Sequence, residues 1–121
     1  MMITRVQFGA APSTEKSCSF LCRKDNQTVG FALGCVTDSP SMLRVLSVKV
    51  NREHRRQGIG TALMQKLLEE AVSRGMNGLM LHVKPSNTPA LSLYRKMGFT
   101  VEERVAGYYD DADAYRMTRD L

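Results

Sequence analysis

The sequence predicts an α+β fold in which one mixed sheet carries two helices. Residues 42–50 alternate between the two faces of a strand, and residues 79–83 form a short, nearly continuous apolar run. Between them, residues 59–74 carry apolar side chains at intervals of three and four, the spacing of an amphipathic helix. A strand, a helix and a strand in this order form a right-handed βαβ unit with parallel strands. Runs typical of antiparallel hairpins lie on either side, so the sheet is expected to be mixed.

The first hairpin is expected near the N-terminus. Two β-like runs, residues 18–23 and 29–36, flank the polar turn Asp25-Asn26-Gln27-Thr28. Residues 1–16 carry the weakest pattern in the chain, and no element is predicted there.

The helix at 59–74 is expected to pack one apolar face against the sheet. The residues predicted on its buried face are Ile59, Leu63, Leu67, Leu68, Ala71 and Val72. The residues predicted on its solvent face are Gln65, Lys66, Glu69 and Glu70. Arg74-Gly75 marks the expected end, because glycine readily adopts the left-handed conformation that closes helices.

A second helix is expected at about residues 89–97. Thr88 followed by Pro89 fits an N-cap with proline at the first helical position, and Gly98 supplies the closing residue. The chain then ends with an expected antiparallel pair of strands and its connection: residues 99–105, Gly107-Tyr108-Tyr109-Asp110-Asp111, and residues 114–118.

Length and composition limit the possible functions. With 121 residues, 43% of them hydrophobic and 24% charged, the chain suits one globular domain. No apolar run approaches the roughly 18 residues of a membrane-spanning helix, and no secretory signal is present, so a cytoplasmic protein is expected. Three cysteines without a CxxC pair and two histidines argue against a metal site. Cys18 and Cys35 could face each other across the hairpin, but buried reduced thiols are the commoner case.

Positive charge is concentrated before a pair of glycines. The net charge of +5 favours an anionic partner. Arg52, Arg55 and Arg56 stand directly before Gly58-Ile59-Gly60, where a strand leads into a helix. Backbone N–H groups of such a loop can bind phosphate, and the helix dipole favours negative charge there. Charge focused on one loop suits a small phosphorylated ligand better than nucleic acid. The alternative is a turn that only connects the two elements.

Two common phosphate-binding motifs do not fit this loop. It lacks the Lys-Ser or Lys-Thr of a Walker loop, and the third glycine of a dinucleotide fingerprint would fall on Leu63. The loop instead has the form Arg55-x-x-Gly58-x-Gly60. Downstream lies Leu81-His82-Val83-x-x-x-Asn87-x-x-Ala90-x-x-Leu93-Tyr94-x-Lys96-x-Gly98-Phe99.

Together these motifs resemble the GNAT superfamily of acyl-CoA-dependent N-acyltransferases, whose pyrophosphate loop and second conserved block they follow. The resemblance implies one N-acetyltransferase domain over residues 1–121. Residues 1–16 would be a short N-terminal segment and residues 17–121 the GNAT-like core.

The resemblance also implies a donor site for acetyl-CoA, without a metal. The two parallel strands, about 44–50 and 79–83, would splay apart around it. Main-chain groups of Val48 and Val50 would hold the pantetheine arm, and Asn87 would contact it. The pyrophosphate would lie on the loop residues Arg55, Arg56, Gln57, Gly58, Ile59, Gly60 and Thr61.

Three residues are candidates for chemistry at the acceptor. The resemblance places Tyr94 near the thioester sulfur, where a phenol can supply the proton for the leaving thiolate; otherwise Tyr94 only belongs to the apolar stripe of its helix. His82 could accept the amine proton, as a histidine does at the matching place in some N-terminal acetyltransferases, or it could be a core residue. Tyr109 lies in a Tyr-Tyr segment that resembles the peptide site of those enzymes, or it packs on the sheet.

The leading acceptor is therefore an N-terminal amine of a protein or peptide, attacking directly in a ternary complex. A small-molecule amine, or a non-catalytic acyl-CoA sensor, is the alternative. Two departures from the family concern the acceptor side. Only about 16 residues precede the hairpin, so either the acceptor pocket is open, or another chain completes it, for example in a homodimer, or the acceptor site has been lost. Arg44 also stands where some N-terminal acetyltransferases place an aromatic residue.

Overall fold

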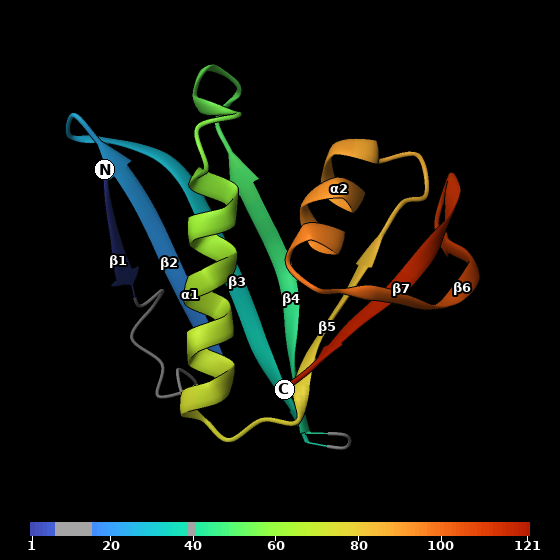
Figure 1. Cartoon of the computed structure of the whole chain (residues 1–121). Coiled ribbons are helices and arrows are strands. Elements are labelled where there is room, and N and C mark those ends of the chain that lie inside the picture. The colour runs from blue at the N-terminus through green and yellow to red at the C-terminus, as the bar shows by residue number, and fades with distance from the viewer. Residues whose placement is uncertain (7–15, 39–40) are drawn as a thin grey trace.

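One seven-stranded sheet with two helices on the same face forms the fold (Figure 1). The computed structural model describes residues 1–6, 16–38 and 41–121. Its elements are β1 (Met2–Val6), β2 (Ser17–Lys24), β3 (Gln27–Asp38), β4 (Ser41–Val50), a 3-10 turn (Arg52–His54), α1 (Ile59–Ser73), β5 (Gly78–Val83), α2 (Thr88–Lys96), β6 (Thr100–Tyr109) and β7 (Ala112–Asp120). The strand order is β1-β2-β3-β4-β5-β7-β6, and only β4 and β5 run parallel. The predicted mixed sheet and βαβ unit are confirmed.

The N-terminal hairpin is confirmed, with a tighter turn than predicted. Only Asp25 and Asn26 connect β2 to β3, and both have positive φ angles, 53° and 65°. A two-residue turn of this kind matches the twist of the strands, and aspartate and asparagine tolerate it. β1 pairs antiparallel with β2 from Met2↔Arg23 to Val6↔Ser19. No element was predicted at β1, because two of its five residues are exposed and three are half-buried, which gives too little alternation.

The three thiols are free. Cys18 lies opposite Gly34, and Cys35 lies opposite Ser17. A Cβ on Gly34 would be 3.3 Å from both Cys18 Sγ and Leu67 of α1, so Cys18 faces the helix. Cys35 follows Gly34 and therefore faces the other side of the sheet. The two thiols thus point to opposite faces, which explains why they do not pair.

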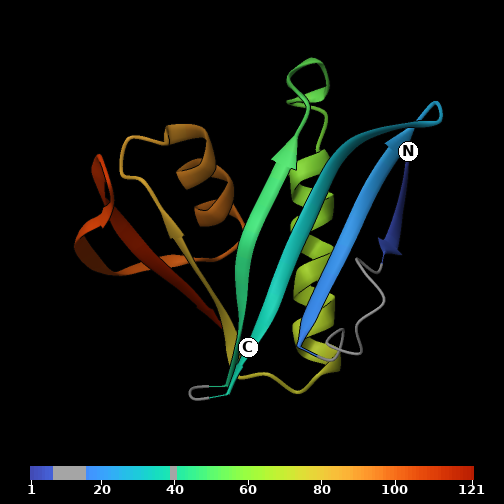
Figure 2. The ribbon, with the colours of Figure 1, turned by 180° about the vertical axis from the view of Figure 1, so that it is seen from behind.

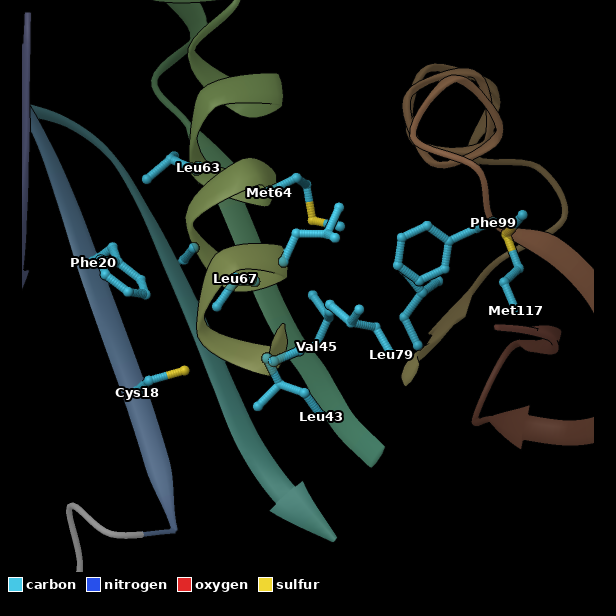
Figure 3. Close-up of a cluster of buried hydrophobic side chains, with 14 of the residues drawn as sticks. Cys18, Phe20, Leu43, Val45, Leu63, Met64, Leu67, Leu79, Phe99 and Met117 are labelled. Carbon is cyan, nitrogen blue, oxygen red and sulfur yellow. The ribbon is translucent and has the colours of Figure 1, made fainter. Parts of the chain in front are cut away.

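The core lies between the sheet and the two helices. Figure 3 shows Phe20 of β2, Val45 of β4 and Leu79 of β5 directed toward Leu67 of α1. The rear of the sheet carries neither helix, as the view from behind shows (Figure 2). Residues of β4 and β5 that alternate with the core residues therefore face this open side.

The buried face of α1 differs from the prediction at its C-terminal end. Val72 is 61% exposed, whereas Glu70 is only 8% exposed, and Met64 is fully buried. Glu70 follows Leu67 by three positions, so helical geometry places it on the buried stripe. Val72 is turned about 100° from Ala71 and leaves that stripe.

Glu70 is buried because two arginines pair with its carboxylate. Arg5 of β1 binds Oε1, and Arg74 Nε donates to Oε2 at 2.7 Å. Burial pushes the pKa of Glu70 upward, but the hydrogen bonds and charges of Arg5 and Arg74 prevail and hold it below its usual value of 4.5. The ion pair between Glu70 and Arg5 therefore connects α1 to β1.

Replacing Glu70 by glutamine should destabilise the fold at neutral pH by about 1–2 kcal/mol, because both arginines lose their charged partner while Arg5 remains largely hydrated. A carboxyl with a depressed pKa contributes stability above its unfolded value, and this contribution disappears as the pH falls through the folded value. Urea denaturation should therefore separate the two proteins at pH 7 and bring them closer together at an acid pH, below the usual carboxyl value of 4.5. An equal difference at both pH values would contradict the ionic role of Glu70.

The start of α2 is corrected by one residue. Asn87, not Thr88, is the N-cap, and its Oδ1 accepts a hydrogen bond from Ala90 N at 3.3 Å. Asparagine caps a helix as well as threonine does, so Thr88 becomes the first helical residue. Gly98, with φ +90°, follows the helix as predicted.

The C-terminal hairpin is confirmed, but its predicted connection is partly strand. β6 extends to Tyr109, and residues 106–108 form a bulge opposite the single residue Asp113. Gly107 has φ +62°, and its N–H donates to Asp113 Oδ1 at 2.9 Å. The bulge turns the side chain of Tyr108 toward β5.

Neither helix in the described part of the chain is long and apolar enough to cross a membrane.

Candidate active site

A gap opens in the sheet between β4 and β5. The two strands pair only at Met42↔Gly78, Leu43↔Leu79 and Arg44↔Met80. Beyond these pairs β4 continues to Val50 and β5 to Val83, and the strands diverge toward their C-terminal ends (Figures 1 and 2). The edge of β4 that includes Val48 and Val50 therefore offers main-chain groups to a ligand. The C-terminal ends of diverging parallel strands are the usual ligand position in open α/β sheets.

The basic loop leads from β4 into the N-terminus of α1. Arg56 and Gly58 adopt left-handed conformations, with φ angles of +64° and +78°. Arg55 Nε donates to Val50 O at 3.2 Å, which holds the start of the loop. Gly58 is the N-cap of α1, so the first N–H groups of the helix follow it directly. The N–H groups of this helix start, the helix dipole and the exposed arginines together have the chemistry of the predicted anion site, which stays a prediction.

Helix α2 closes the other side of the gap. A Cβ on Gly60 would be 3.4 Å from Leu93 of α2 and 3.9 Å from Val50 of β4. A Cβ at Gly60 would thus make ordinary van der Waals contacts, which shows that the first turn of α1 lies beside both elements. Asn87 stands at the N-terminal end of α2, where the cap uses its Oδ1 and leaves its amide N–H groups outside that bond.

Tyr94 lies on the helical side of the sheet. Its ring packs against the core and tilts toward Phe99, with 6.0 Å between centroids. Burial raises the pKa of Tyr94 above its usual 10.0, and the neighbouring Tyr109 adds to the effect. The phenol is therefore protonated throughout the neutral range, as a proton donor must be.

His82 lies on the opposite, open side of the sheet. It alternates with the buried Leu81 and Val83 and is itself half-buried. It follows the last paired residue of β5, Met80, by two positions, so it stands where the gap begins. Burial lowers the pKa of His82, and the charges of Arg44 and Arg116 lower it further, while Glu103 opposes them. The imidazole is therefore neutral at pH 7 and can accept a proton.

The hairpin of β6 and β7 brings two tyrosines to this end of the sheet. The ring of Tyr108 stacks on His82, with 4.2 Å between centroids and 7° between planes. The Tyr109 ring meets Tyr108 edge-on at 4.9 Å, and Lys84 Nζ lies 5.3 Å from its centroid. Burial and Tyr108 raise the pKa of Tyr109. The predicted Tyr109 thus joins the same cluster as His82 and Tyr94.

Two residues of this cluster were not predicted as site residues. Arg44 of β4 donates from Nη2 to Tyr108 Oη at 2.7 Å. In the sequence it stood out only as a departure from the resemblance. The sequence singled out Tyr109 and not Tyr108, because the contact between Tyr108 and His82 depends on the bulge at residues 106–108, which no local pattern predicts.

His54, the second histidine, does not join the cluster. It lies in the 3-10 turn before the basic loop and is half-buried. An open pocket on the rear of the sheet is also distinct from the gap, and it is lined by Met42, Thr100, Val101, Glu102, Arg116, Thr118 and Asp120. None of these lining residues belongs to the basic loop, so this pocket is not the predicted anion site.

Comparison with known proteins identifies the family. The Acetyltransferase (GNAT) family matches residues 5–99. An N-alpha-acetyltransferase from Saccharolobus solfataricus is 34% identical, over 84% of this chain and 68% of its own. The ribosomal protein bS18-alanine N-acetyltransferase of Escherichia coli K12 is 30% identical, over 86% of this chain and 69% of its own. The solved structure of a nourseothricin acetyltransferase is 32% identical and superposes with a TM-score of 0.82, over 91% of this chain and 68% of its own. The anion site, the gap in the sheet and these similarities agree: the chain is an acetyltransferase of the GNAT family.

Proposed function

We propose that this protein transfers an acetyl group from acetyl-CoA to the N-terminal amine of a protein or peptide. One observation carries the proposal: the candidate acid Tyr94 lies on the helical face of the sheet, and the candidate base His82 lies on the rear face, where the β4–β5 gap begins. A donor on the helical side and an acceptor on the rear side can then meet within the gap. This arrangement favours direct attack in a ternary complex.

The donor side is formed by backbone groups. The pyrophosphate would lie on N–H groups of residues 56–61, and the pantetheine arm would follow the free edge of β4 at Val48 and Val50, with Asn87 on the far side. Acetyl-CoA supplies an activated acetyl group as its thioester. Tyr94, which the resemblance puts near the thioester, would give its phenolic proton to the departing sulfur.

The acceptor side provides a base and aromatic surface. His82 takes the proton that the amine loses as its nitrogen bonds to the acetyl carbon, and the carbon–sulfur bond breaks. An α-amine, with a pKa near 8, is roughly a tenth free base at neutral pH, so modest base catalysis suffices. Tyr109 would line the peptide site. The two relatives named for N-terminal or ribosomal protein acetylation support this acceptor.

A small-molecule amine is the second candidate, because the nourseothricin acetyltransferase is similar to this chain over most of its length. Release of CoA thiol from acetyl-CoA, measured against a set of N-terminal peptides and a set of small amines, separates the two. The proposal expects turnover of peptides and little turnover of small amines. The binding of CoA should be measured by calorimetry alongside turnover. Turnover of small amines alone would assign the second function, and CoA binding without any turnover would favour a sensor.

The anion site has its own test. Alanine at Gly58 should weaken CoA binding about tenfold, because a left-handed residue with a Cβ costs about 1–2 kcal/mol and the loop relaxes away from the phosphates. Gly75→Ala is a matched control, since Gly75 has φ +66° and equally open surroundings but lies at the other end of α1. Both variants should lose similar stability, and only Gly58→Ala should lose affinity. Equal affinity in both variants would remove the loop from the donor site.

A further inference from the structure

The imidazole of His82 is oriented by packing and not by hydrogen bonds. Its Nδ1 is buried and has no hydrogen-bond partner among the residues that the structure describes. A hydrogen bond at Nδ1 usually fixes the tautomer and the orientation of an imidazole ring. Without that bond, the orientation of the ring depends on the side chains that pack against it. The face-to-face contact with Tyr108, at 4.2 Å, is the ring contact that can set it.

Tyr108 is itself held from two directions. The bulge at residues 106–108 aims it at β5, and Asp113 fixes that bulge by accepting from Gly107 N and from Arg104 Nε, each at 2.9 Å. From across the gap, Arg44 Nη2 donates to Tyr108 Oη at 2.7 Å. Arg44 is the last residue of β4 that pairs with β5. The contact therefore links β4 to β6 over the start of the gap.

Charged groups from three strands surround His82. Arg44 comes from β4, Arg116 from β7, and Glu103 from β6. Arg116 is already paired with Glu102 at 2.5 Å, so part of its charge is compensated. Arg44 has no carboxylate partner within the described ranges. Its charge therefore acts more fully on His82 than that of Arg116.

We propose that Arg44 and Tyr108 are positioning residues for His82, which hold the neutral imidazole in the plane where Nε2 faces the acceptor amine. The proposal rests on the proposed function, in which His82 accepts the amine proton. Tyr108 fixes the ring plane through stacking. Arg44 fixes Tyr108 and disfavours the imidazolium, because a nearby positive charge opposes protonation.

The chain allows a direct test because it contains only two histidines. Titration of the imidazole ring signals by NMR, assigned with the variant His54→Gln, gives the midpoint of His82 in the unliganded protein. In Arg44→Gln this midpoint should move to higher pH. Arg44→Lys keeps the charge and should keep the midpoint near the wild-type value. Arg23→Gln, which removes an exposed arginine of β2, is the control for a general change of charge.

Activity separates positioning from a structural role. Tyr108→Phe keeps the stacked ring and loses the bond to Arg44, so kcat should fall only two- to threefold. Tyr108→Leu loses both, and kcat should fall about tenfold with little change in the KM for acetyl-CoA. The acid limb of the pH–rate profile should move to higher pH in Arg44→Gln. Thermal unfolding of each variant identifies any that are misfolded, and Tyr108→Phe remains informative if Tyr108→Leu is unstable.

The proposal is overturned if the His82 midpoint is the same in Arg44→Gln and the wild type, or if Tyr108→Leu folds and retains full kcat. A different result would show that the proposed function is wrong while the positioning role is right. A wild-type protein that turns over no peptide, but whose His82 midpoint responds to Arg44→Gln and not to Arg23→Gln, supports the positioning pair and removes the peptide acceptor.

Discussion

Replacing Tyr94 by phenylalanine should lower kcat by about 10²–10³ while leaving CoA affinity within about twofold of the wild type. The substitution removes one oxygen and leaves the ring in its contact with Phe99, so packing is preserved. The substitution removes the phenolic proton donor. Burial and the neighbouring Tyr109 raise the pKa of this phenol above its usual 10.0, so it is protonated at neutral pH. Thiol release under saturating peptide measures kcat, and calorimetry measures CoA binding.

Tyr115→Phe is the matched control for this result. Tyr115 also packs against the core, but it lies on β7 under the guanidinium of Arg104, with 5.7 Å between the guanidinium carbon and the ring centroid. Removal of its hydroxyl should leave kcat within about twofold of the wild type. If Tyr94→Phe behaves like Tyr115→Phe, Tyr94 belongs to the apolar stripe of α2 and is not the acid.

Alanine at Gly78 should cost about 3 kcal/mol of stability, or on the order of 10 °C in Tm. A Cβ at this position would press against the Arg119 carbonyl oxygen of β7 and would lie 3.1 Å from the Met42 methyl group. Since the carbonyl belongs to the paired backbone of β7, it can move only if the β5–β7 ladder shifts. Gly78 is also one of three positions where β4 and β5 pair, so the gap should change shape and CoA binding should weaken.

The comparison with Gly75→Ala isolates the cause. Gly75 requires a left-handed conformation but has open space around it, so alanine there should cost only about 1–2 kcal/mol. Urea denaturation of the two variants should rank Gly78→Ala as the less stable, and only Gly78→Ala should bind CoA more weakly. Equal stability of the two variants would show that the β7 backbone at Arg119 can shift at little cost. It would also show that the pairing of β4 with β5 does not depend on the close approach of Gly78 to Arg119.

Local patterns predicted the parts of the fold that local interactions determine. The period of three and four residues placed α1 within one residue at each end, and the glycines at 58 and 98 marked a helix start and a helix end. The basic loop was found because the strand, the glycines and the helix are consecutive in the chain. His82, Tyr94 and Tyr109 came from the family resemblance, and the structure brings them to the same end of the sheet; their roles stay predictions.

Features that depend on distant partners could not be predicted. Burial of Glu70 depends on Arg5, 65 residues earlier in the chain, and the Arg44–Tyr108 bond joins residues 64 apart. The sequence of the amphipathic helix around Glu70 does not indicate that Arg5, on a distant strand, will pair with its carboxylate. The strand β1 became visible only through its pairing with β2.

The three-residue pairing of β4 with β5 divides the sheet into two panels joined at one corner. One panel comprises β1 to β4 with α1, and the other comprises β5 to β7 with α2. A donor seated in the gap would touch both panels, through the start of α1 and the start of α2, and would act as a brace across the opening. Binding should therefore stabilise the protein, by a free energy that grows with the logarithm of the donor concentration divided by its Kd. It should also slow amide hydrogen exchange most at the diverging ends of β4 and β5, where the panels can otherwise move apart.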